Sequence, residues 1–165
     1  MITASESAFP NCAINVLKDF LEAIDPDVPV YKRPLRLGDP IQAFAIVPST
    51  WMPDESTWEI GRRHDLSGPT VTRYMIAIQC YNQDMDQERG ASVSSRMSGI
   101  VRNMLSRDVD IRVALGRLTN REYGFVERFT RGYVQAQRFL TNEVDGSFLH
   151  LSNLEFIVET EITNE

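Results

Sequence analysis

The sequence predicts an α+β fold, in which two amphipathic helices pack on one face of an antiparallel β-sheet. Two stretches repeat apolar residues at helical spacing, and several others alternate apolar and polar residues as half-buried strands do. No internal repeat or low-complexity segment interrupts this pattern. The 165 residues fit a single domain over residues 1–165. A chain of this length can bury about 70% of its unfolded surface.

The first part of the chain contains one predicted helix and one predicted strand. Residues 11–24 carry apolar side chains at helical spacing, and Asp25-Pro26 ends this helix. Residues 25–40 contain four prolines and are therefore expected to be extended or irregular. Ala43 to Val47 is the longest uninterrupted apolar run, and Ile41 to Val47 predicts a buried strand.

A long polar loop is predicted between the first two strands, at residues 48–69. It contains three prolines, and Trp51 and Trp58 give it two large side chains to bury. Loops of this length in compact domains usually serve a function or are disordered. The tryptophans either pack onto their own domain or lie at a protein interface, where tryptophan is enriched. Arg62 and Arg63 of the same loop are further interface candidates.

The next segment reads as a strand followed directly by a helix. Within residues 71–82, every second side chain from Tyr74 to Cys80 is apolar and shares one face of a strand, opposite a mixed face that runs from Arg73 to Gln79. Asp84 and Gln87, three positions apart, suit the first turn of a helix as a capping pair. Residues 93–105 then repeat apolar side chains at helical spacing, which predicts the second amphipathic helix.

Residues 109–115 are ambiguous between strand and helix. Val109, Ile111, Val113 and Leu115 alternate with polar or small residues, which favours a strand. Ile111 and Leu115 are also four residues apart, a spacing that fits a helix. We therefore expect a strand here and keep a helix as the alternative.

The last third of the chain predicts two long strands joined by a turn. Phe125 to Leu140 is aromatic and β-branched, with a bend expected at Gly132. Asp145-Gly146 marks the turn. One face of the final strand is apolar, and the other face carries an isoleucine among three carboxylates, which we expect to be an exposed interface. These interface candidates are Glu155, Ile157, Glu159 and Glu161.

Charge is unevenly distributed along the chain. The net charge of −6 and a pI near 5.0 argue against a general nucleic-acid-binding protein. Residues 96–138 nevertheless hold nine arginines against four acids, whereas residues 139–165 hold six acids and no Lys or Arg. Two solvated faces of opposite sign explain this, as does contact between copies of the chain. Arg128, Arg131 and Arg138 are the basic interface candidates, and pairing with the glutamates of their own subunit is the competing explanation.

The sequence offers no convincing active site. Ser67, His64 and Asp65 share one loop and so have no rigid triad geometry. The acidic residues from Asp84 to Glu88 resemble the start of an EF-hand loop, but Arg89 stands where that loop needs glycine. Motifs for dinucleotides, nucleotide phosphates or zinc are absent. We therefore expect a protein that is not an enzyme, with no catalytic residue, no metal ligand and no cofactor.

Cysteine usage and hydropathy favour an intracellular protein. Cys12 and Cys80 form no CxxC pair and both lie among apolar residues, so we expect them to pack in the core. No apolar stretch is long enough to cross a bilayer as a helix, and the N-terminus has no secretory signal pattern. The cytoplasm is the expected compartment.

Several stretches resemble the tail terminators of long-tailed bacteriophages. VTRYMIAIQCYNQDMDQERGASVSSRMSGIVRNML is a long strand that turns directly into an amphipathic helix, as in that family. FTRGYVQAQRFL and NLEFIVETEIT are similar to its closing strands, and the helix at residues 12–24 is similar to its opening helix. The resemblance covers most of the chain and rests on the order of the elements more than on identities.

This resemblance implies a structural role in a virion. Terminators of this family form a hexameric ring on the head-proximal end of the tail tube, stop tube polymerisation and join the tail to the head. The implied partners are further copies of the chain, the tail-tube protein and the head–tail connector proteins, with DNA only passing through the ring. The alternatives are a connector (neck) protein, a tail-tube protein or, from another class, a small cytoplasmic enzyme or ligand-binding domain.

Overall fold

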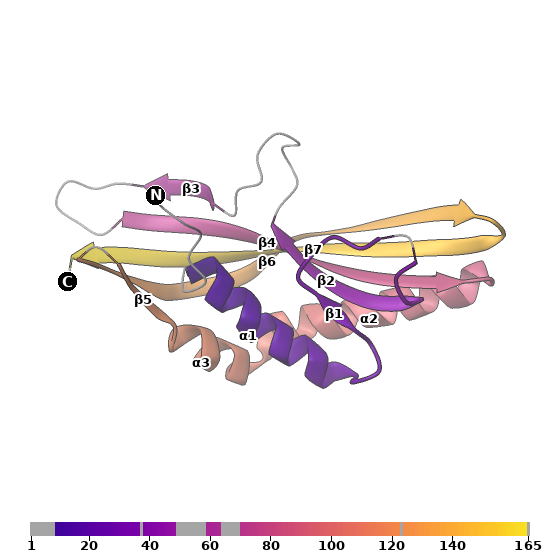
Figure 1. Ribbon diagram of the computed structural model, residues 1–165, viewed down its shortest axis with the longest axis horizontal. Helices are drawn as coiled ribbons and strands as arrows, with labels where there is room; N and C mark the ends of the chain where they lie inside the picture. The colour runs from indigo at the N-terminus through magenta and orange to yellow at the C-terminus, as the bar shows by residue number, and fades with distance from the viewer. Residues whose placement is uncertain (1–8, 37, 49–58, 64–69, 123, 165) are drawn as a thin grey trace.

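The computed structural model describes residues 9–36, 38–48, 59–63, 70–122 and 124–164. Within them, seven strands form one sheet, and three helices lie on one side of it (Figure 1). The helices are α1 Phe9–Ile24, α2 Gln87–Arg107 and α3 Val109–Gly116. The strands are β1 Val30–Tyr31, β2 Gln42–Pro48, β3 Glu59–Arg63, β4 Thr70–Asp84, β5 Thr119–Glu122, β6 Phe125–Val144 and β7 Ser147–Asn164.

The sheet is antiparallel except at one edge. Its strand order is β1-β2-β4-β7-β6-β5, with β3 also paired to β4, and only the short β1–β2 pair is parallel. Apolar side chains from all three helices and from β2, β4 and β7 form one core on the helix-covered face. This arrangement confirms the predicted α+β class and the predicted placement of helices on one face.

The opening helix packs as its apolar pattern predicts. Ala13, Leu17 and Leu21 recur every four residues and are completely buried in α1. Phe9 begins the helix and stacks on Tyr74 of β4, with ring centroids 6.3 Å apart. The helix ends at Ile24, where Asp25-Pro26 was expected to end it.

The start of α2 is capped two residues later than expected. Asp86, not Asp84, is the N-cap, and its side chain accepts a hydrogen bond from the Arg89 amide. Asp84 instead accepts hydrogen bonds from the Arg89 side chain and from the Asp86 amide. These contacts, the Arg89 pair foremost, lower the pKa of Asp84 to about 2. Both carboxylates therefore stabilise the positively polarised start of the helix.

The first half of α2 approaches the sheet closely because it presents small side chains. Gly90, Ser94 and Ser98, each four residues apart, are buried, whereas the larger side chains were expected to face the core here. A Cβ atom on Gly90 would lie 2.7 Å from Nε2 of His150 in β7. The Gly90 carbonyl also accepts a hydrogen bond from the side chain of Asn82 in β4. The buried stripe turns apolar further along the helix, at Val101 and Leu105.

The segment that was expected to be a strand is the helix α3, so that expectation is wrong. The Asp108 carboxylate accepts hydrogen bonds from the Asp110 and Ile111 amides and caps the helix. Only Ile111 and Leu115 are buried, and Val109 and Val113 are exposed. A strand would have placed all four side chains on one face. The helix instead directs two of them into the core and two toward solvent.

Asp108→Ala should therefore lower the free energy of unfolding by about 1 kcal/mol, within the ~0.5–2 kcal/mol range of N-cap losses. Urea unfolding measures this change. Asp110→Ala is the matched control, because Asp110 is exposed in the first turn and its backbone, not its side chain, takes part in the cap. Equal losses for the two variants would contradict the assignment of Asp108 as the cap.

The two longest paired strands form a hairpin that projects from one end of the molecule (Figure 1). Its turn residues, Asp145 and Gly146, have φ angles of 51° and 77°, as a two-residue hairpin turn requires. The register shifts once between Phe129 and Arg131 and once between Val134 and Ala136. These irregularities lie on either side of Gly132, where the sequence predicted a bend.

Two further expectations differ from the structure. Residues 59–63 of the predicted loop form β3, which pairs with β4, so the loop expectation is wrong there, and residues 49–58 and 64–69 lie outside the described part. Cys80 is buried as expected, and burial raises its pKa to about 12, but Cys12 is only half-buried. Among the described helices, none is both long and apolar enough to cross a membrane.

Candidate assembly surface

The outer edge of β6 is largely unpaired within the described residues. β5 pairs only with Phe125 to Arg128, so that the rest of β6 has β7 on one side and no strand on the other. Edge strands present free backbone N–H and C=O groups to which another chain can bind. This edge is therefore a candidate site for contact with a second protein chain.

We name the distal part of the hairpin, residues 139–148, the hairpin end. Each residue from Arg138 to Gly146 is exposed. Phe139 is 57% exposed and Leu140 is 63% exposed, and Val144 is also exposed. Large apolar side chains exposed on a projecting edge strand are typical of a binding surface rather than of a solvated strand.

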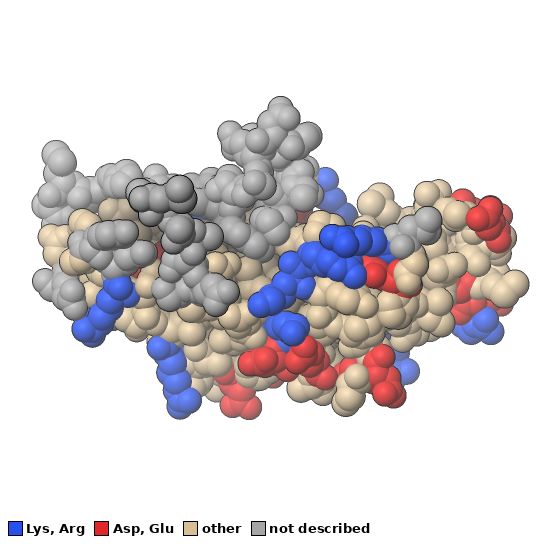
Figure 2. All heavy atoms as spheres, viewed as in Figure 1, with Lys and Arg blue, Asp and Glu red and all other residues tan. Residues whose placement is uncertain are grey.

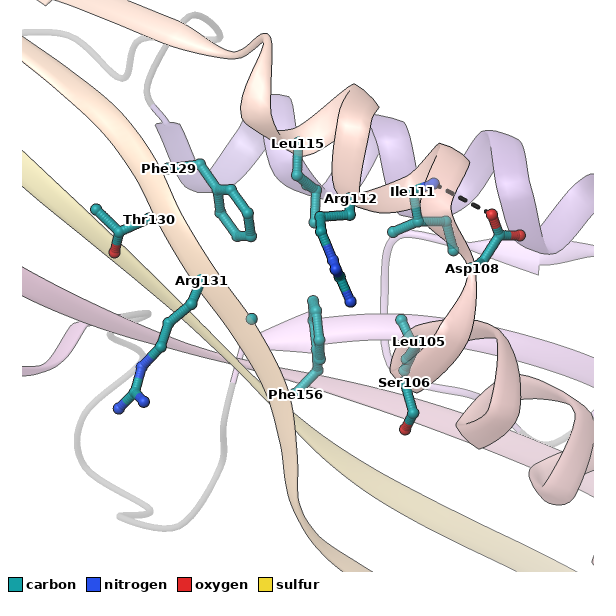
Figure 3. Close-up of a pocket in the computed structure, with 11 residues that line it drawn as sticks. Leu105, Ser106, Asp108, Ile111, Arg112, Leu115, Phe129, Thr130, Arg131 and Phe156 are labelled. Carbon is teal, nitrogen blue, oxygen red and sulfur yellow. Dashed lines mark hydrogen bonds between the residues drawn. The ribbon is translucent and has the colours of Figure 1, made fainter.

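A groove lies on the helix-covered side of β6, between that strand and α3 (Figure 3). We name it the α3 groove. Its volume is about 300 Å³. Its lining is mixed: Leu105, Ile111, Leu115, Phe129, Gly132 and Phe156 are apolar or glycine, and Ser106, Asp108, Arg112, Thr130 and Arg131 are polar or charged.

Gly132 allows the strand to pass closely over the floor of the α3 groove. A Cβ atom at this position would lie 2.7 Å from Cζ of Phe156, which is buried beneath β6. Glycine in a strand often marks such a close approach. In Figure 3 the Arg112 side chain extends from α3 into the space between the helix and β6, whereas Arg131 points away on the other side of the strand.

Exposed charges of opposite sign lie around α3 and on the hairpin end. Four exposed arginines in or near α3 and the start of β6 have no ion-pair partner in the described structure, and the hairpin end carries two exposed acids. Figure 2 shows acidic side chains at the end of the molecule from which the hairpin projects, with basic side chains close by. Such complementary charges favour contact between one end of a subunit and the other end of a neighbour. The arginines are Arg107, Arg112, Arg117 and Arg128, and the acids are Glu143 and Asp145.

Two of the three glutamates proposed for an interface, Glu155 and Glu159, pair instead with arginines of their own chain. Nε of Arg131 lies 2.7 Å from Oε2 of Glu159, and this hydrogen bond raises the pKa of Arg131. Arg73 also approaches Glu159, at 3.9 Å, and Arg138 approaches Glu155, at 3.8 Å. Pairing within one subunit was the competing explanation, and the structure shows it. Glu155 and Glu159 are largely buried by their surroundings.

The expected exposure of Ile157 is wrong. Its side chain is 0% exposed, and β7 is an interior strand with β4 on one side and β6 on the other. The sheet register places Met75 and Tyr133 beside it. Ile157 is thus part of the folded subunit and not an apolar patch among exposed carboxylates.

The structure describes only some of the other interface candidates. Arg128 and Glu161 are exposed and lie opposite each other on β6 and β7. The backbones of Arg62 and Arg63 pair with β4, whereas their side chains, like Trp51 and Trp58, lie outside the described part. A role of these residues in contacts between subunits stays a prediction.

Two buried polar groups have hydrogen-bond partners within the fold. The Glu127 carboxylate accepts hydrogen bonds of 2.6 Å from both Tyr74 and Thr160. His150 is buried against Gly90, and its Nδ1 lies 3.1 Å from Oγ1 of Thr141. Among the described residues, no group of three or more His, Cys, Asp or Glu is arranged to hold a metal ion. His64 lies outside the described part.

Sequence analysis missed both the hairpin end and the α3 groove. The groove depends on α3, which was expected to be a strand, and on contacts between residues far apart in the chain. The hairpin end had a local signal in the sequence. The strand was expected to end at Leu140, but the turn lies only at Asp145-Gly146, so the strand can continue to Val144. Which side of that strand stays unpaired depends on the sheet order alone.

The fold defines a class of small α+β proteins in which helices cover one face of a largely antiparallel sheet. One solved structure with this fold is a chain from the virion of a native gene transfer agent particle. It is 14% identical, with a TM-score of 0.51, over 97% of this chain and 99% of that chain. A second solved chain is 13% identical over 94% of this chain and 96% of its own, and its TM-score is only 0.43.

Comparisons at the level of sequence gave no relative. No protein-family model matches the chain, and no curated protein matches it. The likeness to the virion chain at 14% identity shows a shared fold over nearly the full length of both chains.

Proposed function

We propose that this protein is a non-enzymatic structural component of a phage-like particle, located in the virion. The observation that carries this proposal is the full-length likeness in fold to a chain of a gene transfer agent virion. The similarity of its sequence stretches to tail terminators points in the same direction. Fold alone does not define function, and the surface features of the chain add support.

Within such a particle, we infer the role of tail terminator. The protein would form a ring, hexameric in the family it resembles, on the head-proximal end of the tail tube. There it stops tube polymerisation and joins the tail to the head–tail connector proteins. A closed ring requires each subunit to offer two different surfaces to its neighbours. The hairpin end and the α3 groove are two such surfaces, and they differ in charge.

Deleting the gene and imaging the resulting particles tests this role. Loss of a cap that stops polymerisation should give tail tubes of uncontrolled, mostly excessive length that are not attached to filled heads. Loss of a tail-tube protein should instead abolish tubes, and loss of a connector protein should leave tubes of normal length without heads. Expression of the intact chain from a plasmid in the same cells is the control and should restore normal particles.

Two outcomes contradict the proposal at different levels. Absence of tubes, or unattached tubes of normal length, would replace the terminator role by that of a tube or connector protein. Normal infectious particles without the protein would contradict a structural role altogether. In the latter case, the alternative of a small enzyme or ligand-binding domain would take its place.

A further inference from the structure

We propose that the hairpin end of one subunit docks into the α3 groove of a second copy of this chain. A ring needs head-to-tail contacts, so this contact deepens the proposed function. It rests on the proposed function only in taking a second copy of this chain as the partner. Three features of the described residues support it: complementary apolar surface, complementary charge and the distance between the two surfaces.

The hairpin end offers exposed apolar side chains, and the α3 groove offers an apolar floor. Phe139 and Leu140 follow one another in β6 and so point to opposite faces of the hairpin end, each more than half exposed. One of them at a time can therefore enter the α3 groove, whose volume is about 300 Å³ and whose floor is formed by Phe129 and Phe156. Burial of an aromatic or aliphatic anchor in a pocket is the usual source of affinity at a protein interface.

The charges around the two surfaces select this pairing. Glu143 and Asp145 lie on the hairpin end, whereas Arg112 lines the α3 groove and Arg107 ends α2 next to its lining residues Ser106 and Asp108; Asp108 is engaged as the cap of α3. The two acids of the hairpin end and these two arginines have no ion-pair partner in the described structure, unlike Arg131, which is paired with Glu159. Unpaired charges of opposite sign favour association in one orientation and oppose contact between two like ends.

The positions of the two surfaces make the contact intermolecular. The hairpin end lies at one end of the long axis of the molecule and α3 lies toward the other (Figure 1). A subunit therefore cannot place its hairpin end in its own α3 groove. Because the two surfaces differ, each docked subunit leaves one surface open for the next, and such a contact generates rings or filaments.

Cysteine cross-linking of the isolated protein tests this contact without any virion. The variant Asn142→Cys with Ser106→Cys, in a Cys12→Ala background, places one thiol on the hairpin end and one at the α3 groove; both positions are exposed. Mild oxidation should give a ladder of covalent oligomers on a non-reducing gel. The matched control replaces Ser106→Cys by Ser92→Cys, an exposed serine of α2 outside the lining of the groove, and should give no ladder.

A mixing experiment tests the same contact from both sides. A hairpin variant, Phe139→Asp with Leu140→Asp, and a groove variant, Arg112→Glu, should each weaken self-association by about tenfold or more, the loss of one buried contact. All three positions are exposed, and circular dichroism and thermal unfolding verify that the variants fold. Mixed together, the two variants retain one intact contact and should form a 1:1 complex in sedimentation velocity.

The results separate this proposal from the proposed function. A double-cysteine variant that cross-links no better than its control overturns the docking contact, even if the protein is later found in virions. A ladder together with a 1:1 complex supports the contact, even if gene deletion contradicts the terminator role. If the hairpin variant fails to enter particles while cross-linking of the double-cysteine protein matches its control, the hairpin end binds a different protein and the proposal is wrong.

Discussion

Gly90→Ala should lower the free energy of unfolding by about 1–3 kcal/mol, the usual loss from overpacking a core. The new Cβ atom would lie 2.7 Å from Nε2 and 2.8 Å from Cδ2 of His150. The same atom would also approach Cβ of Asp84 at 3.0 Å, so α2 cannot avoid the contact by a small rotation. Urea unfolding of the purified variant measures the change.

Gly99→Ala is the matched control for this variant. Gly99 lies in the same helix, and a Cβ atom there meets nothing within 4 Å. Alanine is favoured over glycine inside a helix by about 1 kcal/mol, so this variant should gain stability. Adding His150→Ala to Gly90→Ala should reduce the combined loss below the sum of the single losses, because the clash is gone. Equal gains at Gly90 and Gly99 would contradict the close approach of α2 to the sheet.

Phe156→Ala should cost about 3–5 kcal/mol of stability, the range for truncating a buried phenylalanine. Its side chain is almost fully buried between the helices and β6, where it forms the floor of the α3 groove. Truncation leaves a cavity that the neighbouring side chains fill only in part. The midpoint of urea unfolding should therefore fall further than for the Gly90 variant.

Phe139→Ala provides the comparison within the same hairpin. Phe139 is largely exposed, so its truncation should change stability by less than about 0.5 kcal/mol. If the hairpin end docks as proposed, this variant should nevertheless weaken self-association. A large loss of stability from Phe139→Ala, or a small one from Phe156→Ala, would contradict the burial of these two side chains.

The elements defined by local signals could be predicted from the sequence. The helix before Asp25-Pro26, the strand-to-helix segment and the hairpin turn at Asp145-Gly146 depend on neighbouring residues alone. The prediction of a strand at residues 109–115 was wrong because the periodicities of a strand and of a helix overlap over this short stretch. The Asp108 cap, which lies immediately before this stretch, was the signal that favours the helix.

Features that depend on the order of the strands could not be predicted from the sequence. The glutamates of β7 alternate with apolar residues as on a solvated strand, but β7 lies inside the sheet. Arg73 of β4 and Arg131 of β6 therefore reach Glu159 from both sides. The burial of Ile157 has the same origin. The groove under Gly132 similarly needs α3, β6 and β7 to be placed together, which no local pattern specifies.

Cryo-electron microscopy of the particle neck, with the chain built into the reconstruction, tests the central claim most directly. The account predicts one closed ring of this protein between the last ring of tail-tube subunits and the head–tail connector. In that ring, the hairpin end of each subunit should lie in the α3 groove of its neighbour. A reconstruction that shows the chain repeated along the whole tube, or particles that lack it entirely, would contradict the claim that this protein terminates the tail.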